Sequence, residues 1–382
     1  MRGEINLNVG KKEEPNRCEL LGSSDNDVIH RIHDNCTTSS DKCQSIDKEL
    51  EEKWTPKKQE GEPLVMCYYR LGYEEKAKRV ADCGTFLEFA RYGGMQEGAG
   101  GLPLGGVPCT GDSFKLHRAN FCRDRLCPMC SWRRSYKIFG QVSQIMDLIA
   151  DKYEFLFLTL TVPNCTADEL INTLNSMAKG WIKLSRHKRF KAVVKGFFKA
   201  LEITYNQTAD TYHPHFHVVL AVPKHYFKDE QYIHRDEWLS MWQKAMNDSS
   251  ITQVDIRKAK DKHKEKIGKT AAEKLASAVA EIAKYAVKSS DYLFDDEELT
   301  DKVVSVLVPA LADRRLCSFG GCFKEAHQAL QLDDTENGDL IHIDGQLRSD
   351  VALQIYRYGW SCGAYKLIEV IDKANILAEY DE

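Results

Sequence analysis

The segment "HPHFHVVLAVP", residues 213–223, restricts the fold of this chain more than any other segment. On a β-strand alternate side chains share a face, so His213, His215 and His217 point one way while Pro214 and Phe216 point the other. A lone histidine is commonly a hydrogen-bonded core residue, whereas a row of imidazoles opposite an apolar face can converge on one cation. The pattern therefore predicts a buried strand that carries a metal site.

A candidate third ligand lies in the preceding predicted strand. The segment "ALEITYN" places Glu202 among apolar and β-branched residues, where a carboxylate is costly unless it is paired or bound to a metal. If this strand pairs with the histidine strand, Glu202 joins His215 and His217; otherwise it is an exposed residue of an edge strand. Two imidazoles and one carboxylate suit a catalytic zinc, or a Mg²⁺ or Mn²⁺ that polarises a phosphate, and the spacing leaves this choice open.

Strands and helices are predicted in an order that defines the fold class. "YEFLFLTLTVP" is a strand from Tyr153, and Thr166 with Glu169 forms a capping box that opens a helix toward Lys183. "VVKGFFKALEITYN" and the histidine strand follow, joined by the turn-like "NQTADTY", then a fourth strand, "ITQVDIRKA", and a helix, "KTAAEKLASAVAEIAKYAVKSS". We expect an α+β fold in which an antiparallel β-sheet has helices packed on one face, with a small Cys-rich zinc-binding segment in addition.

That zinc-binding segment is predicted from "NFCRDRLCPMCSWRRSYK". Cys122, Cys127 and Cys130 give the spacing C-x4-C-x2-C, and a tetrahedral zinc site needs one further ligand, which could be Cys83, Cys109 or His117. Basic residues surround the cysteines and alternate with Phe121, Trp132 and Tyr136, a composition suited to phosphates and stacked bases. The basic residues are Arg118, Arg123, Arg125, Arg133, Arg134 and Lys137, of which we take Arg123, Arg125, Arg133 and Arg134 as candidate DNA contacts.

The helix that ends near Lys288 carries a polar stripe. Glu281, Tyr285, Lys288 and Tyr292 are spaced i, i+4, i+7 and i+11. A tyrosine hydroxyl is a poor nucleophile at its free pKa near 10, so it would need a nearby cation or base, and Lys288 and Glu281 each lie about one turn away. Taken alone, the stripe is better explained as a solvated helix face.

Charge and composition divide the chain of 382 residues into four parts. Residues 1–62 hold 10 Lys+Arg and 14 Asp+Glu, residues 63–290 hold 35 and 24, and residues 291–382 hold 8 and 19. The basic middle suits a polyanion partner. We expect a polar, disordered leader (1–62), a Cys-rich, basic segment (63–148) with helical spacing over 65–91 and a glycine-rich connector, a core (149–292), and an acidic linker followed by a C-terminal segment (293–382).

The chain has no apolar run of the roughly 18 to 20 residues that a membrane span needs, and its first residues lack the apolar stretch of a signal peptide. We therefore expect a cytoplasmic protein with no membrane partner. In that compartment thirteen cysteines indicate thiols and a metal rather than disulfides.

Four motifs, in their order along the chain, resemble the rolling-circle replication initiators of small bacterial plasmids, which belong to the HUH endonucleases. They are "FCRDRLCPMCSWRRS", "FLFLTLTVPN", "LEITYN" followed by "HPHFH", and "EIAKYAVKSSDY". The resemblance extends from about Cys83 to Tyr292 and continues weakly in "RRLCSFGGCFKEA".

The resemblance implies a metal-assisted nickase. His215, His217 and Glu202 would hold Mg²⁺ or Mn²⁺, with Zn²⁺ in the Cys-rich segment. Tyr285 would cut one strand at the double-strand origin, keeping the 5′ phosphate and freeing a 3′ hydroxyl. Lys288 would assist at the scissile phosphate, and Glu281 would activate water in termination unless Tyr292 serves as a second nucleophile.

The expected partners are single-stranded or hairpin origin DNA, a host helicase and the host replication machinery, with a homo-oligomer left open. A separate helicase fits the lack of a G-x-x-x-x-G-K-[ST] motif. The rival interpretations are a mobilisation relaxase or single-strand transposase of the same superfamily, a zinc hydrolase, and a non-enzymatic zinc-dependent DNA-binding regulator.

Overall fold

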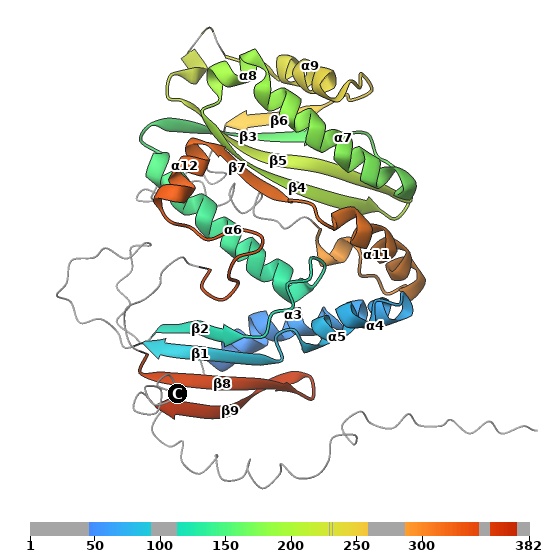
Figure 1. Ribbon diagram of the computed structural model, residues 1–382, viewed down its shortest axis with the longest axis vertical. Helices are drawn as coiled ribbons and strands as arrows, with labels where there is room; N and C mark the ends of the chain where they lie inside the picture. The colour runs from blue at the N-terminus through green and yellow to red at the C-terminus, as the bar shows by residue number, and fades with distance from the viewer. Residues whose placement is uncertain are drawn as a thin grey trace, which may run out of the picture.

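The computed structural model describes residues 46–92, 113–228, 230, 232–258, 287–343 and 352–372. Its larger sheet contains, in spatial order, β6 (Val254–Lys258), β3 (Tyr153–Thr161), β5 (Thr211–Pro223), β4 (Gly196–Asn206) and β7 (Cys317–Gly321), and every pair is antiparallel (Figure 1). The four strands predicted from the sequence are confirmed, and β7 adds a fifth from the C-terminal part of the chain. The fold class is α+β, as predicted.

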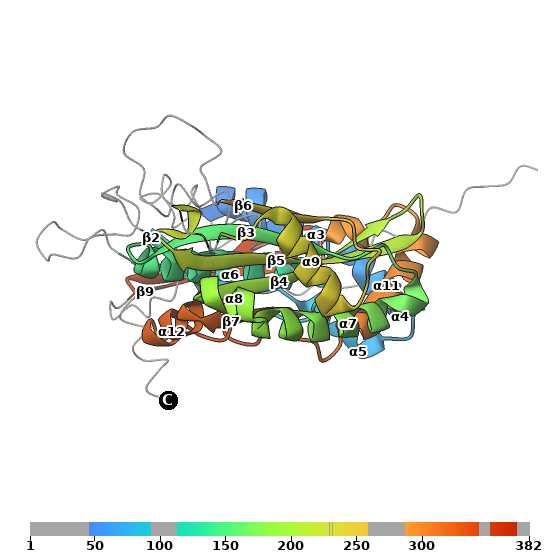
Figure 2. The same cartoon turned by 90° about the horizontal axis from the view of Figure 1, so that it is seen from above.

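Helices α7 (Ala167–Arg186), α8 (Lys188–Val193) and α9 (Arg235–Met246) lie together on one face of this sheet (Figures 1 and 2). The predicted capping box opens α7: the Thr166 amide donates to Glu169 Oε2 at 3.0 Å. Trp181 of α7 and Trp242 of α9 both pack edge-on to Phe216, with ring centroids 6.3 and 6.5 Å away. The apolar face of the histidine strand is therefore buried under these helices, and the histidines point to the opposite face.

Helices α6 (Pro128–Ile149) and α12 (Cys322–Ala329) lie on that opposite side (Figure 1). Phe323 of α12 packs edge-on to Phe155 of β3 at a centroid distance of 6.1 Å. By alternation Phe155 shares a face with Thr159, which pairs with His217 across β3 and β5. Val219, one step further along the same face, is fully buried. The end of the histidine face near Phe155 and Val219 is therefore covered by apolar packing, and the polar residues of this face lie at its other end.

A smaller antiparallel sheet has the order β2 (Ser113–Ala119), β1 (Phe86–Tyr92), β8 (Gln354–Ser361) and β9 (Ala364–Asp372). The predicted helical spacing over 65–91 is right for α4 (Glu62–Arg70) and α5 (Glu74–Asp82) and wrong beyond them, because 86–92 is a strand. Leu87 and Phe89 alternate with less apolar neighbours and are both buried, which is the period of a strand between two partners.

The C-terminal part of the chain does not form a separate unit in the structure. Helix α11 (Glu297–Leu311), β7 and α12 pack with the larger sheet, whereas β8 pairs with β1 of the Cys-rich segment. The acidic stretch predicted as a linker is the start of α11: Asp296 caps the helix by accepting from the Leu299 amide at 3.1 Å. Acidic side chains are favourable at a helix N-terminus, which accounts for their concentration there.

Residues 46–62 correct the predicted leader. They form helical turns, η2 (Leu50–Trp54) and α3 (Thr55–Gln59), and bury Ile46, Leu50 and Trp54. Trp54 packs edge-on to Phe89 and Trp132, with centroid distances of 5.6 and 4.9 Å. These three apolar residues recur at i, i+4 and i+8, a helical stripe that the many charges around it conceal. The remainder of the predicted leader lies outside the described residues.

The segment 333–343, here named the acidic loop, is anchored on α6 by a buried lysine. Lys137 is 2% exposed, and its Nζ donates to Asp333 Oδ2 at 2.8 Å, to the Asp334 carbonyl at 2.7 Å and to the Asp339 carbonyl at 2.9 Å. Nearby, Gln141 Nε2 donates to the Asp333 carbonyl at 2.8 Å. The ammonium group is the internal cation around which the loop backbone folds.

Two predicted segments lie mostly or wholly outside the described residues, namely the glycine-rich connector and the helix over 269–290. The described end of the latter contains Val287, Lys288 and a single turn, η4 (Ser289–Asp291), so the helix does not extend to Ser290. Among the helices that the structure describes, none is both long and apolar enough to cross a bilayer.

Candidate metal centres

The predicted imidazole and carboxylate ligands converge on one point of the larger sheet. Strands β4 and β5 pair so that Glu202 lies directly opposite His215. Glu202 Oε2 is 2.7 Å from His217 Nε2 and 3.2 Å from His215 Nε2, and the two Nε2 atoms are 3.1 Å apart. We call Glu202, His215 and His217 the triad. The sequence predicts that Glu202 lies beside the histidines if the two strands pair. The strands do pair, and Glu202 lies beside both histidines.

The hydrogen bonds around the triad orient the two imidazoles. His215 Nδ1 lies 3.1 Å from the His213 carbonyl, which can only accept, so Nδ1 donates to it and Nε2 is the ring nitrogen left to bind a metal. His217 Nδ1 lies 3.4 Å from the Thr159 hydroxyl. Burial would raise the pKa of Glu202, but the adjacent imidazoles lower that pKa by more, so the carboxylate is ionised.

Three inward acceptors can hold a divalent cation. Adjacent ligand atoms about 2.1 Å from an octahedral Mg²⁺ are about 3.0 Å apart, close to the separations in the triad. Glu202 is 4% exposed, and a carboxylate buried so deeply needs a cation beside it. The donor set therefore fits a metal ion, and its nitrogen and oxygen atoms would accept Mg²⁺, Mn²⁺ or Zn²⁺.

Lys288 contacts the triad, and Asp291 follows it in the next turn. Lys288 Nζ is 3.2 Å from Glu202 Oε1, and the lysine side chain is half exposed. The Asp291 amide donates to the Lys288 carbonyl at 2.9 Å, and Asp291 Oδ2 is buried without a hydrogen-bond partner in the described part of the chain. Burial raises the pKa of Asp291, which Lys288 opposes. No sequence pattern singles out Asp291, because it is the first residue of an acidic run at the predicted end of the core.

The other residues predicted on the polar helix stripe divide into two groups. Glu281 and Tyr285 lie outside the described residues. Tyr292 is fully buried, and its hydroxyl donates to the Leu126 carbonyl, so it is part of the core beneath the cysteine cluster. This position does not favour Tyr292 as a second nucleophile.

The cysteines come together in a second cluster, formed by Cys83 after α5 and by Cys122, Cys127 and Cys130 at the start of α6. The Sγ atom of Cys83 lies 3.5 Å from that of Cys130 and 3.6 Å from that of Cys127. The Sγ atoms of Cys122 and Cys130 are 3.7 Å apart. Sulfurs about 2.3 Å from a tetrahedral Zn²⁺ lie about 3.8 Å apart, so the cluster fits that ion.

The surroundings of the cysteine cluster support thiolates. The Arg123 amide donates to Cys130 Sγ at 3.2 Å, and the Asp124 amide donates to Cys122 Sγ at 3.4 Å. Lys58 lies beneath the cluster and donates to the Cys83 carbonyl at 2.9 Å. Burial lowers the pKa of Lys58, and the neighbouring thiols oppose this. Of the three candidates for the fourth ligand, Cys83 is in the cluster, His117 is on β2 outside it, and Cys109 lies outside the described residues.

The structure corrects the predicted role of two arginines. Arg133 and Arg134 are buried, at 7% and 3% exposed. Arg133 donates to the Leu340 and Ile341 carbonyls, both at 2.9 Å, and Arg134 donates to the Asp124 carbonyl at 3.0 Å. These guanidinium groups donate to the protein's own backbone and expose little surface to any ligand. The Arg133 guanidinium also lies over the Trp54 ring, 5.2 Å from the ring centroid. The sequence around Arg133 does not reveal this contact, because Trp54 is distant along the chain.

The other two predicted DNA contacts are nearer the surface. Arg123 is exposed and donates to the Asn337 carbonyl at 3.1 Å. Arg125 is half-buried, donates to the Arg314 carbonyl, and has Nη2 3.7 Å from Glu336 Oε2. Of the four, only Arg123 is exposed, and it lies at the rim of the cysteine cluster.

Comparison with known proteins assigns the family. A family model described as "Replication protein" matches residues 113–365. A "Protein rep" from Bacillus sp is 41% identical over 280 residues, which cover 71% of this chain and 86% of that protein. A "Protein rep" from Streptococcus pneumoniae is 36% identical over 76% of this chain and 83% of its own length. A "Protein rep" from Staphylococcus aureus is 37% identical over 64% of this chain and 96% of its own length.

No solved structure matches the chain. The matched range includes the triad, three of the four clustered cysteines, the whole larger sheet, and β2 and β8 of the smaller sheet. The chain therefore belongs to the replication protein family of plasmid replication initiators.

Proposed function

We propose that this initiator nicks one strand of its plasmid origin by tyrosine transesterification at the triad. The observation that carries the proposal is the convergence of Glu202, His215 and His217, with Lys288 Nζ 3.2 Å from the Glu202 carboxylate. A bound Mg²⁺ or Mn²⁺ would supply charge neutralisation at the scissile phosphate. The sheet supplies the rigid positions from which the three ligands project, because β4 and β5 are central strands with neighbours on both sides.

In the proposed step the Tyr285 hydroxyl oxygen bonds to the phosphorus and the bond from phosphorus to the 3′ oxygen breaks. The tyrosine gives up its proton, the leaving 3′ oxygen gains one, and the 5′ phosphate stays on the protein. Lys288 is three residues after Tyr285, so the chain allows at most about 11 Å between their Cα atoms, which is compatible with a role for both at one phosphate. The exchange of one phosphodiester for another conserves its energy, which is consistent with the lack of a nucleotide-binding loop.

For termination we propose Glu281 as the residue that activates water or the final hydroxyl. Its competitor in the sequence, Tyr292, is fully buried and donates to a backbone carbonyl. The cysteine cluster, with a structural Zn²⁺, would hold the start of α6 and the exposed Arg123 in place against single-stranded or hairpin DNA. Separation of the strands would be the work of a host helicase, and the host replication machinery would extend the 3′ hydroxyl.

The proposal is tested by covalent capture. Full-length protein is mixed with a labelled single-stranded oligonucleotide spanning the origin of its own plasmid, with and without Mn²⁺, and the tryptic peptides are analysed by mass spectrometry. We expect a nucleotide adduct on Tyr285 that Glu202→Gln and His217→Ala abolish. Tyr285→Phe should form no adduct. The matched control is Tyr69→Phe, at an exposed tyrosine of α4, which should form the adduct as the wild type does.

The rival functions give different results in the same assay. A zinc hydrolase of the His2Glu type would cleave without an adduct and would remain active in Tyr285→Phe. A non-enzymatic regulator would bind the origin without cleaving it. A relaxase or transposase would form the adduct on transfer or transposon-end sequences rather than on the replication origin, and such an outcome would overturn the assignment to origin nicking.

A further inference from the structure

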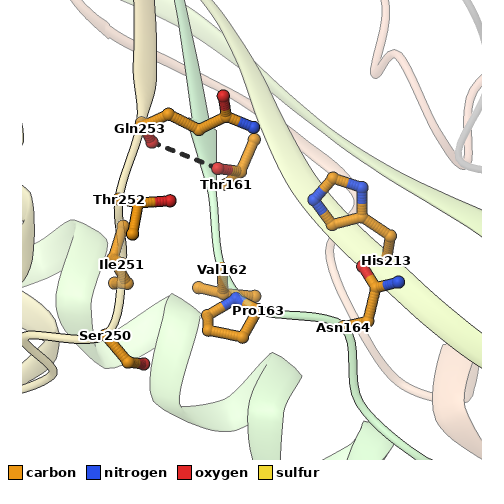
Figure 3. Close-up of a pocket in the computed structure, with 9 residues that line it drawn as sticks. All are labelled: Thr161, Val162, Pro163, Asn164, His213, Ser250, Ile251, Thr252 and Gln253. Atoms are coloured by element: carbon orange, nitrogen blue, oxygen red, sulfur yellow. Dashed lines mark hydrogen bonds between the residues drawn. The ribbon is translucent and has the colours of Figure 1, made fainter.

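A pocket adjoins the triad at the polar end of the histidine face (Figure 3). Its walls are the end of β3 with the residues after it, the segment before β6, and His213 of β5. Its volume is about 220 Å³. The lining residues are Thr161, Val162, Pro163, Asn164, His213, Ser250, Ile251, Thr252 and Gln253.

The pocket lies beside the triad in the sheet. Thr161 pairs with His215 across β3 and β5, so a residue of the wall and a ligand of the metal centre are direct neighbours. The His213 and His215 rings have centroids 5.3 Å apart and point to the same face of β5. In Figure 3 the His213 ring faces Gln253 and Thr252 across the space, while Val162 and Pro163 lie between them.

The chemistry of the walls suits an uncharged ring with polar edges. None of the nine lining residues is Lys, Arg, Asp or Glu, so the pocket offers no Lys or Arg to pair with a phosphate. It offers hydroxyls from threonine and serine, amides from Asn164 and Gln253, and apolar surface from Val162, Pro163 and Ile251. Within the described part of the chain, the Gln253 side-chain amide makes no hydrogen bond, and the Asn164 amide nitrogen donates to Thr211 Oγ1 at 3.2 Å. Side-chain amides can donate and accept at once, as the edge of a base requires.

The size of the pocket limits the occupant. A single water needs only about 10–15 Å³, whereas pockets for drug-sized ligands begin near 300 Å³. A space of 220 Å³ between these limits suits one heterocyclic ring system with its substituents. The phosphates on either side of such a ring would remain outside, next to Lys288 and the triad.

We infer that this pocket receives one nucleobase of the origin strand beside the scissile phosphate, and that Gln253 and Thr252 read its edge while His213 packs against its face. The inference rests on the proposed function, because it needs the scissile phosphate at the triad. It assigns part of the sequence preference of nicking to the strand ends of the larger sheet, separately from the cysteine cluster. Base recognition in single strands works in this way, through polar contacts to the edge and ring contacts to the face.

The test measures base preference in the full-length protein. Origin oligonucleotides randomised at the three nucleotides on either side of the nick are incubated with Mn²⁺, and the cleaved products are sequenced. Gln253→Met and Thr252→Val keep the side-chain size but remove hydrogen bonding. We expect each to reduce the preference at one and the same position by about 5- to 100-fold, the value of one good base contact, while preferences at the other positions stay as in the wild type. Gln243→Met, at a glutamine of α9 that donates to the Ile251 carbonyl, is a control for the stability of the neighbouring loop.

A second measurement separates the inference from the proposed function. Binding of an uncleaved oligonucleotide is compared with binding of the same oligonucleotide lacking the base at that position. The wild type should lose affinity for the abasic strand, and Gln253→Met should lose less, because Thr252 and His213 keep their contacts to the base. Unchanged preferences and an unchanged abasic effect in both variants would overturn the pocket assignment even if Tyr285 forms its adduct. If no adduct forms but the abasic effect is present and is reduced in Gln253→Met, the pocket assignment stands as a binding site and the nicking step fails.

Discussion

Replacing Arg134 with glutamine tests whether this arginine stabilises the fold or contacts DNA. The guanidinium donates to the carbonyls of Arg123, Asp124 and Glu336, the last at the longer distance of 3.4 Å. A buried carbonyl that loses its donor costs about 1–3 kcal/mol. Water can reach the carbonyl of exposed Arg123, so two buried acceptors remain and the free energy of unfolding should fall by about 2–4 kcal/mol.

The assay for Arg134→Gln has two readouts. Urea unfolding should shift to a lower midpoint, and zinc should be released at a lower urea concentration, because Arg134 braces the loop that carries Cys122. The salt dependence of single-strand binding should stay unchanged, since a lost phosphate contact would reduce its slope by about 0.7. Arg79→Gln, at an exposed arginine of α5, is the control and should change stability by less than about 0.5 kcal/mol. Unaltered unfolding together with a reduced salt slope would refute the buried-clamp interpretation and restore the DNA contact.

Three further predictions concern the metal centres and one buried charge. Cys127→Ser should lower the zinc content from one ion per chain to well below one and lower the unfolding midpoint, as measured by metal analysis and urea titration; a full zinc ion in the variant would exclude Cys127 as a ligand. Glu202→Gln should weaken Mn²⁺ binding at least tenfold in calorimetry without loss of zinc, and equal Mn²⁺ affinity would remove Glu202 from the triad. Burial lowers the pKa of Lys199 to about 8 from 10.5, so the folded state releases its proton first and stability should rise between pH 8 and 10.5 by up to roughly 3 kcal/mol. Lys199→Met should lack this rise and be more stable than the wild type at pH 7; identical pH profiles would contradict the burial of a charged Lys199.

The histidine strand and its partner could be predicted from the sequence because their signals are local. Alternation fixes the face of His215 and His217, and a short turn between two strands fixes their antiparallel pairing, which puts Glu202 opposite His215. The capping box of α7 is likewise complete within four residues. Three clustered cysteines also sufficed to predict a metal cluster.

The parts that could not be predicted depend on contacts between distant segments. Strand β8 pairs with β1 across more than 260 residues of chain, and no local pattern encodes that partner. Arg133 and Arg134 have the composition of a DNA surface, and only the positions of the acidic loop and Trp54 show that they are buried. Lys288 reaches Glu202 from the far end of the core, and the buried Asp291 carboxylate follows in the next turn, which no local pattern in the sequence indicates.

The acidic loop has a consequence for how this protein responds to metal depletion. Its residues Asp333, Thr335, Asn337 and Gly338 have the spacing of the first positions of a calcium-binding loop, and the Asp339 carbonyl occupies the position of a backbone ligand. The cation at its centre is the ammonium of Lys137, which is bonded to the chain and cannot dissociate. Chelators that would remove metal ions from the cysteine cluster and the triad cannot remove this ammonium group from the loop. The fold of the loop therefore does not depend on the supply of ions in the cell.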